Sequence, residues 1–333
     1  MKSMWLVDLS KAVLGIYGFL LWTNSVGAPV YANVECGETI TTNTVLTNDI
    51  INCSAPHRWV VRVKGATLNM DGHTIQCSEQ PSNTDDPRVA EFGVLLIGKN
   101  SRVENGNVRN CSIGIELIGR KHRARNMDVY AKIGIAVRAK GSIVKGNSLL
   151  GYWSWNDLCS SCPQTPGILV SPLARKNHID KNWITRFFYG VEAGGKRNRI
   201  SDNVIDYGIV GVLASGDDNI INRNTILREN SIGVEIIGSK NDVSSNQVIR
   251  SSNGFYVGRA YERNPARLNT LANNHATVNG AIGISLQRAD RTRVTKNSAF
   301  SNFRLDLRDL SPLCGTNNWI ANLHSTFDPE CIQ

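Results

Sequence analysis

The chain has 333 residues, of which 41% are hydrophobic, and its 37 basic and 28 acidic side chains give a net charge of +9. This hydrophobic content excludes an intrinsically disordered chain, and the length is sufficient for one large core. After the N-terminal segment, no part of the chain is apolar for long enough to predict a stable membrane span.

The first 32 residues have the pattern of a signal peptide. Lys2 and Lys11 precede the apolar run Ala12–Trp22, and the sequence Val30-Tyr31-Ala32 follows as a cleavage site that ends in a small residue. We therefore expect residues 1–32 to be a signal peptide and residues 33–333 to be the mature domain of a secreted or periplasmic protein. An uncleaved N-terminal anchor is the alternative.

The mature chain repeats a glycine that is followed by apolar-x-apolar. These glycines are Gly93, Gly114, Gly134, Gly167, Gly190, Gly211, Gly233, Gly254 and Gly283, at spacings of 21, 20, 33, 23, 21, 22, 21 and 29 residues. A second mark, an apolar residue followed three positions later by asparagine, recurs at Asn147, Asn182, Asn203, Asn224, Asn246 and Asn297, and in weaker form at Asn126 and Asn274. A period of about 21 residues with such marks is typical of a solenoid.

Each repeat contains three short alternating runs and almost no helical periodicity, as residues 220–239 illustrate. This pattern predicts an all-β protein: a single parallel β-helix solenoid with three strands per coil and about ten coils, stacked ~4.8 Å apart. Asparagine tolerates left-handed backbone at corners, and stacked asparagine side chains can hydrogen-bond to one another. We therefore expect the recurring asparagines to be structural.

Three stretches of the chain resemble a known group of proteins. They are the opening "CGETITTNTVLTNDIINCS" with "LNMDGHTIQC", the repeats with asparagine corners, and the ending "CGTNNWIANLHSTFDPEC". Over about residues 35–331 the chain resembles the right-handed parallel β-helix proteins of the pectate-lyase-like superfamily. Within it, the closest resemblance is to the carbohydrate-binding and sugar-hydrolase repeat domain, which is related to the maturation β-helix of nitrous oxide reductase. The resemblance implies a right-handed β-helix and leaves the chemistry open.

Eight cysteines follow the N-terminal segment, and an even number indicates disulfides in an exported chain. Cys77 and Cys111 each come five residues after a glycine, so they hold the same place in successive coils, and we expect them to pair. The pairs Cys36–Cys53 and Cys314–Cys331 bracket the first and last coils and would close the ends. Cys159 and Cys162 are expected to form a local disulfide, with a redox pair or a metal site as the alternatives.

Long insertions interrupt the repeat at residues 78–91 and 151–166, and a shorter one lies around 258–267. The register places them on both sides of the glycine-containing strand, where they would form the walls of a groove. In the group that the chain resembles, substrate lies along this sheet. Tyr152, Trp153 and Trp155 could present their rings to sugars, and packing onto the coil is the alternative.

Residues of the glycine-containing strands that alternate with the core positions should line the floor of this groove. Among them, Glu192 and Glu235 are two coils apart, or about 9.6 Å, which is near the upper end of the carboxyl spacing of ~6.5–9.5 Å in inverting glycosidases. Asp217 and Asp218 follow the intervening strand. These four are the catalytic candidates. No metal site or cofactor is predicted, although four carboxylates could hold Ca²⁺. A plain polar corner is the alternative.

Basic residues should stack along the rim that carries Asp217 and Asp218. They are Lys99, Arg120, Lys121, Lys140, Arg175, Lys176, Lys196, Arg197, Lys240, Arg259 and Arg288. Of these, Lys196, Arg197, Lys240 and Arg259, together with Tyr256 on the groove floor, are the candidates for substrate binding. A basic row attracts polyanions, and in an exported protein an acidic polysaccharide fits better than nucleic acid. Charge that keeps the protein soluble is the alternative.

The sequence therefore predicts a secreted β-helix that acts on or binds an acidic polysaccharide, as a hydrolase or lyase of the polyuronate type. A non-catalytic glycan-binding, adhesion or structural β-helix is the alternative. We expect a monomer that binds no nucleic acid and keeps no membrane span after cleavage of the signal peptide.

Overall fold

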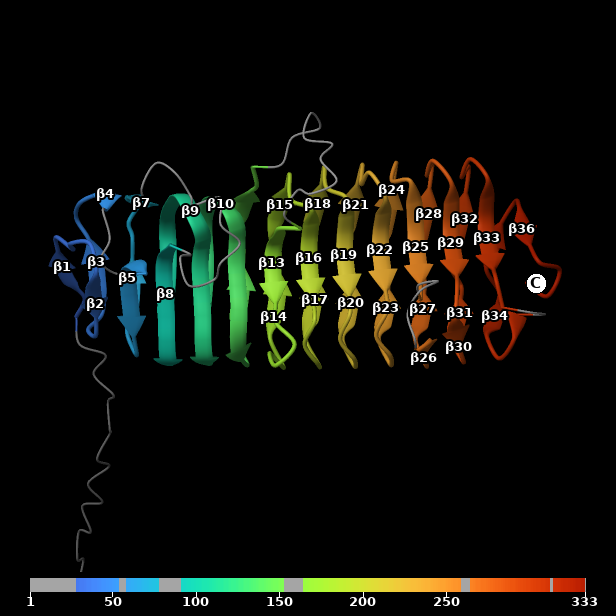
Figure 1. Ribbon diagram of the computed structural model, residues 1–333, viewed down its shortest axis with the longest axis horizontal. Coiled ribbons are helices and arrows are strands. Elements are labelled where there is room, and N and C mark those ends of the chain that lie inside the picture. Colours follow the sequence, from blue (N-terminus) through green and yellow to red (C-terminus); the bar gives the residue numbers. More distant parts are fainter. Residues whose placement is uncertain are drawn as a thin grey trace, which may run out of the picture.

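The computed structural model describes residues 28–53, 58–77, 91–152, 164–258, 264–311 and 314–332. The backbone winds through parallel strands that form three sheets, here called A, B and C, each of which runs the length of the molecule (Figure 1). Each coil contributes one strand to each sheet in the order A, B, C, and pairs with the equivalent strand of the next coil. The all-β solenoid with three strands per coil is confirmed.

The strands have the following bounds. Sheet A contains β2 (Glu38–Ile40), β5 (Trp59–Lys64), β8 (Phe92–Lys99), β13 (Pro166–Val170), β16 (Tyr189–Ala193), β19 (Val210–Ala214), β22 (Ile232–Ile236), β25 (Asn253–Val257), β29 (Ile282–Leu286), β33 (Leu305–Asp309) and β36 (Phe327–Asp328). Sheet B contains β1 (Val30–Ala32), β3 (Thr44–Leu46), β6 (Thr67–Asn69), β11 (Ile143–Lys145), β14 (His178–Asp180), β17 (Arg199–Ser201), β20 (Ile220–Asn222), β23 (Asp242–Ser244), β27 (Thr270–Ala272), β31 (Arg293–Thr295) and β34 (Asn318–Ile320). Sheet C contains β4 (Ile50–Cys53), β7 (Thr74–Cys77), β12 (Ser148–Leu150), β15 (Trp183–Thr185), β18 (Val204–Asp206), β21 (Thr225–Leu227), β24 (Gln247–Ile249), β28 (His275–Thr277), β32 (Ser298–Phe300) and β35 (Leu323–His324).

Two long strands, β9 (Arg102–Arg120) and β10 (Arg123–Lys140), pass through all three sheets without a break. A separate pair, β26 (Ala266–Arg267) and β30 (Ala289–Asp290), lies between sheets A and B. Within the described ranges no helix is long and apolar enough to cross a membrane.

The core consists of stacked aliphatic and aromatic side chains. In sheet A, Val191, Val212, Val234 and Phe255 follow one another in register and are fully buried. The repeated glycine near the start of the sheet A strands is required for steric reasons. A Cβ on Gly211 would lie 2.5 Å from Ile226 Cγ2 and 2.6 Å from the carbonyl oxygen of Gly233, so a larger residue would push the coils apart.

Asparagines form a buried ladder at the corner between sheets B and C. It runs through Asn147, Asn182, Asn203, Asn224, Asn246, Asn274, Asn297 and Asn322. Each side-chain amide donates to the carboxamide oxygen of the next asparagine, as Asn203 Nδ2 does to Asn224 Oδ1 at 2.9 Å. The expected structural role is therefore confirmed for this row, with one exception. Asn126 is exposed and bonds to Asn105, while the buried ladder position of its coil belongs to Met127.

Disulfides join Cys36 to Cys53 and Cys314 to Cys331 near the two ends, and Cys77 to Cys111 in neighbouring coils with a Cα–Cα distance of 5.1 Å. The expected closure of the first and last coils is confirmed. Cys159 and Cys162 lie outside the described residues.

Candidate functional site

The outer face of sheet A carries one continuous row of side chains. The register aligns Arg62, Leu95, Glu116, Ala136, Leu169, Glu192, Leu213, Glu235, Tyr256, Ser285 and Arg308 in successive coils. Glu192 and Glu235 therefore belong to the same row, and Leu213 is the residue of the row that lies between them.

The two glutamates of this row differ in their surroundings. Burial of Glu192 raises the pKa of its carboxyl above the usual value, so it holds a proton to higher pH than an ordinary glutamate. Glu235 is only 3% exposed. It lies next to Tyr256, where burial, followed by the negative charge of Glu235, raises the pKa of the phenol. A carboxyl with a raised pKa and a second carboxyl on one sheet face are the groups that general acid–base catalysis uses.

Asp217 and Asp218 lie at the corner between sheets A and B, where each faces a cation. Asp217 is 2.8 Å from Lys196 Nζ and accepts a hydrogen bond from the amide of Ser239 at 3.0 Å. Although burial opposes them, these bonds lower the pKa of Asp217. Asp218 has a left-handed backbone and its carboxylate is 3.9 Å from Arg197 Nε. The structure thus joins two catalytic candidates to two binding candidates.

No three His, Cys, Asp or Glu side chains of the described ranges gather closely enough to hold a metal ion. All four candidate carboxylates belong to those ranges.

A row of exposed cations runs along the corner between sheets A and B. Lys99, Arg120, Lys140, Arg175 and Lys196 occupy the same position in five successive coils. We call this row the cation ladder. Of its members only Lys196 has an ion pair among the described residues, and the row ends where Asp217 takes the next position. Lys121, Lys176 and Arg197 are exposed as well and follow ladder residues in the chain.

The remaining binding candidates are spread over the molecule. Lys240 is exposed at the corner between sheets A and B, beyond the end of the cation ladder. Tyr152 follows sheet C, where its ring packs edge-on against Tyr130 at a centroid distance of 4.4 Å. Burial there raises the pKa of Tyr152 to about 12. It borders a pocket of about 400 Å³ with Arg109, Leu150 and Arg186. Trp153, Trp155 and Arg259 lie outside the described residues.

Sequence reasoning missed two buried glutamates. Glu116 is 2% exposed and forms a 3.0 Å ion pair with Arg138 Nε, which lies two residues further along the next coil. Burial raises the pKa of Glu116 and the charge of Arg138 opposes that shift. A search for opposite charges on the diagonal of neighbouring outward positions would have found this pair.

Glu229 is the second missed glutamate, at the corner between sheets C and A. It is 2% exposed, and neither carboxyl oxygen makes a hydrogen bond of ordinary geometry in the described structure. Its carboxyl occupies space left by Gly208 in the preceding coil, where a Cβ would lie 2.6 Å from Glu229 Oε2. Burial, followed by the charge of Asp206, raises its pKa well above the usual 4.5, and the nearby amide of Gly208 opposes this shift only weakly.

This shift predicts how the stability of the protein varies with pH. Folded Glu229 keeps its proton above pH 4.5 while the unfolded chain loses it, so Glu229 destabilises the fold increasingly as pH rises. Glu229→Gln should remove this loss, and the stability difference between variant and wild type should grow by about 1.4 kcal/mol per pH unit until the folded pKa is reached. Urea unfolding at several pH values measures it, with exposed Glu330→Gln as the control. A difference independent of pH would show that Glu229 is ionised in the fold.

Comparison with known proteins agrees with the coil geometry. Residues 166–325 match the family described as the right handed beta helix region. The structure of a double mutant of the periplasmic alginate epimerase AlgG superimposes over 88% of this chain and 78% of that one, with a TM-score of 0.58 and 13% identity. The chain has the right-handed parallel β-helix fold.

Two further solved structures share this β-helix fold. The Dettilon tailspike protein is 14% identical over 88% of this chain and 58% of its own, with a TM-score of 0.50. The A-module of the mannuronan C-5 epimerase AlgE6 from Azotobacter vinelandii is 13% identical over 88% and 83%, with a TM-score of 0.50. At these identities the likeness concerns the fold. None of the curated proteins matches the sequence.

Proposed function

We propose that this β-helix is an exported protein that binds a linear acidic polysaccharide of the polyuronate type along sheet A and acts on it as a hydrolase or lyase. The cation ladder carries this proposal. It places one exposed positive charge per coil along the edge of sheet A, and four of its five members have no ion pair in the described ranges. Such a row attracts a chain that carries regular negative charges.

The outer row of sheet A supports a chemical step on the bound polymer. Glu192 has the raised pKa that a proton donor needs, and Glu235 lies two coils away beside Tyr256. In this proposal Glu192 donates a proton to the leaving oxygen and Glu235 acts as base, while Asp217 and Asp218 hold Lys196 and Arg197 in place. Two of the similar folds are epimerases, one of alginate and one of mannuronan, which supports a polyuronate.

A second candidate is a non-catalytic glycan-binding or structural β-helix. The ion pairs of Asp217 with Lys196 and of Asp218 with Arg197 favour it, because they use two of the four acids in charge pairing. As a glycan-binding protein it would use the same cation ladder and would differ from the first candidate only in turnover.

One experiment tests binding and turnover together. The full chain is incubated with pectate, alginate, a glycosaminoglycan and a neutral glucan, beside a triple variant that carries Arg120→Gln, Lys140→Gln and Arg175→Gln. This variant should bind polyuronate about tenfold or more weakly. The control variant, with Lys181→Gln, Lys296→Gln and Arg304→Gln, removes three exposed cations from other corners and should bind normally.

The products distinguish the candidate reactions. New reducing ends without ultraviolet absorbance indicate a hydrolase, and absorbance from unsaturated uronates indicates a lyase. Binding without any change in the polymer supports the non-catalytic candidate. Equal affinity of both triple variants for polyuronate would contradict the proposed function.

We also propose export with removal of the N-terminal segment. β1 pairs with β3 through Val30, Tyr31 and Ala32, so cleavage after Ala32 would remove a strand. The sequence Ser25-Val26-Gly27 offers a second site with small residues, and cleavage after Gly27 would keep β1. Mass spectrometry of the exported protein decides: an N-terminus at Ala28 supports the retained strand, Asn33 supports its loss, and Met1 contradicts cleavage.

A further inference from the structure

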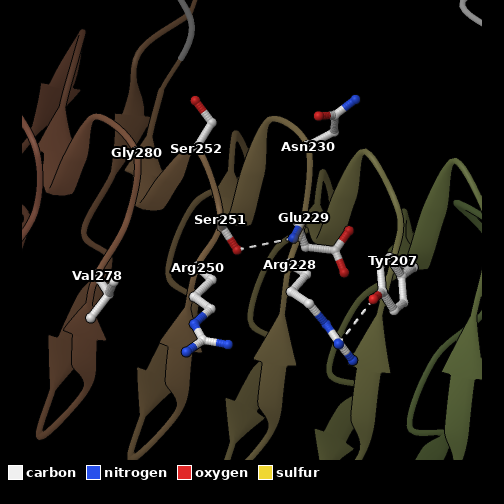
Figure 2. A pocket seen from close by; sticks show the side chains of 9 residues that line it. All are labelled: Tyr207, Arg228, Glu229, Asn230, Arg250, Ser251, Ser252, Val278 and Gly280. Atoms are coloured by element: carbon white, nitrogen blue, oxygen red, sulfur yellow. Dashed lines mark hydrogen bonds between the residues drawn. The ribbon is translucent and has the colours of Figure 1, made fainter. Parts of the chain in front are cut away.

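A pocket of about 500 Å³ lies at the corner between sheets C and A, on the opposite side of sheet A from the cation ladder. Tyr207, Arg228, Arg250 and Val278 hold the same corner position in four successive coils, directly after paired residues of sheet C. Figure 2 shows the side chains of Arg228 and Arg250 side by side, extended toward the same side of the corner. Two guanidinium groups therefore line one opening.

Arg228 is fixed in place by its neighbours. Its Nε donates to Asp206 Oδ1 at 2.9 Å, its Nη2 donates to the second oxygen of Asp206, and its Nη1 donates to the hydroxyl of Tyr207 at 3.0 Å. Its guanidinium carbon lies 4.1 Å from the centre of the Tyr207 ring. A guanidinium has five N–H donors, so these three bonds leave two for a ligand.

Arg250 lies in the next coil and is exposed, and its guanidinium has no hydrogen bond or ion pair among the described residues. Asp206 balances the charge of Arg228, so Arg250 gives this part of the corner an uncompensated positive charge. Its planar fork suits a carboxylate, which can accept two parallel hydrogen bonds from it.

The other lining groups are compatible with an anion and with a sugar ring. Glu229 is buried behind the pocket, and because burial raises its pKa it favours its neutral form and repels an anion less than an ordinary carboxylate does. Asn230 and Ser252 offer polar groups at the rim, and Val278 offers an apolar surface with 54% exposure. Sugars present both hydroxyl groups and an apolar ring face.

We propose that this corner pocket is a second glycan site, which binds one uronate residue through contacts of its carboxylate with Arg250 and the unused donors of Arg228. The anion follows from the two arginines. The sugar class rests on the proposed function, and the site itself is separate from the outer row of sheet A and from the cation ladder.

Titration of the full chain with digalacturonate, followed by nuclear magnetic resonance, tests the proposal, with the amide signals of Ser252 and Gly280 as reporters of this pocket. Arg250→Gln should weaken the binding seen at these signals about tenfold or more. Lys181→Gln is the control, because Lys181 is an exposed cation in the same left-handed conformation at the corner between sheets B and C and should leave the binding unchanged. The triple variant of the cation ladder should also leave it unchanged, even if its polymer binding is lost.

Three further ligands define the class. Cellobiose should not shift the signals, and acetate and inorganic phosphate should bind more weakly than digalacturonate. Equal affinity for acetate would overturn the sugar assignment, and tighter binding of phosphate would replace it with a phosphate site. Unchanged digalacturonate binding by Arg250→Gln, or no shift with digalacturonate, would overturn the pocket while leaving the proposed function of sheet A untouched.

Discussion

Asn203→Ala should lower the free energy of unfolding by about 3 kcal/mol. Asn203 is 1% exposed, and its Oδ1 accepts bonds at 2.9 Å from both the backbone amide and the side-chain amide of Asn182. Its own Nδ2 donates to the carbonyl of Ile179 at 3.0 Å and to Asn224. The substitution leaves the amide of Asn182 buried without its acceptor and opens a gap in the ladder.

Urea unfolding followed by circular dichroism, with the disulfides intact, measures this loss. Exposed Asn318→Ala is the matched control and should change stability by less than about 0.5 kcal/mol. If Asn203→Ala were as stable as the control, the buried asparagines would fill space without stabilising the corner through their hydrogen bonds.

Glu192→Gln and Glu235→Gln should each lower turnover on the active substrate by about 10²–10⁴-fold. Glutamine keeps the size of each side chain but can neither donate the acidic proton of Glu192 nor act as the base proposed for Glu235. Binding of the intact polymer should remain within about threefold of wild type, because the cation ladder is unchanged. Initial rates together with equilibrium binding separate these effects.

The pH profile gives a second test of the same assignment. Burial raises the pKa of Glu192, and an acid catalyst is active only while protonated, so the alkaline limb should lie above that of an ordinary glutamate. Glu104→Gln on sheet B is the control and should leave rate and profile unchanged. Full turnover in both sheet A variants would remove these residues from the reaction.

The fold could be predicted because each coil follows the same backbone path and therefore needs the same residue types at the same positions. In the sheet A strands a glycine is needed because a side chain would collide with the neighbouring coil, as at Gly211. At the B–C corners an asparagine is needed to hydrogen-bond to the next coil. Both residues therefore recur in the sequence once per coil. The same periodicity placed Glu192 and Glu235 correctly in one outward row. Asn126 was misplaced because it lies one residue before the ladder position, a shift that spacing alone does not resolve.

The candidate site was harder to predict because charge pairing depends on side-chain directions. Asp217 and Asp218 looked like neighbours of the glutamates, but the structure pairs them with Lys196 and Arg197. Glu229 does not belong to a residue pattern that repeats between coils, because the equivalent corner position holds Gly208 in one neighbouring coil and Ser251 in the other. Alignment of those three residues coil by coil would have shown an acid at a position that is occupied by small residues in the neighbouring coils.

The spacing of the cation ladder is set by backbone hydrogen bonds between coils, whereas its charges lie at the tips of long flexible side chains. If the charges of a bound polymer repeat at a different spacing, the offset between polymer charges and ladder charges increases by the same amount at every coil. Lysine and arginine tips can absorb such an offset over a few coils. In the proposed function the ladder would then distinguish polymers by their length and charge density, and the outer row of sheet A would distinguish the individual sugars.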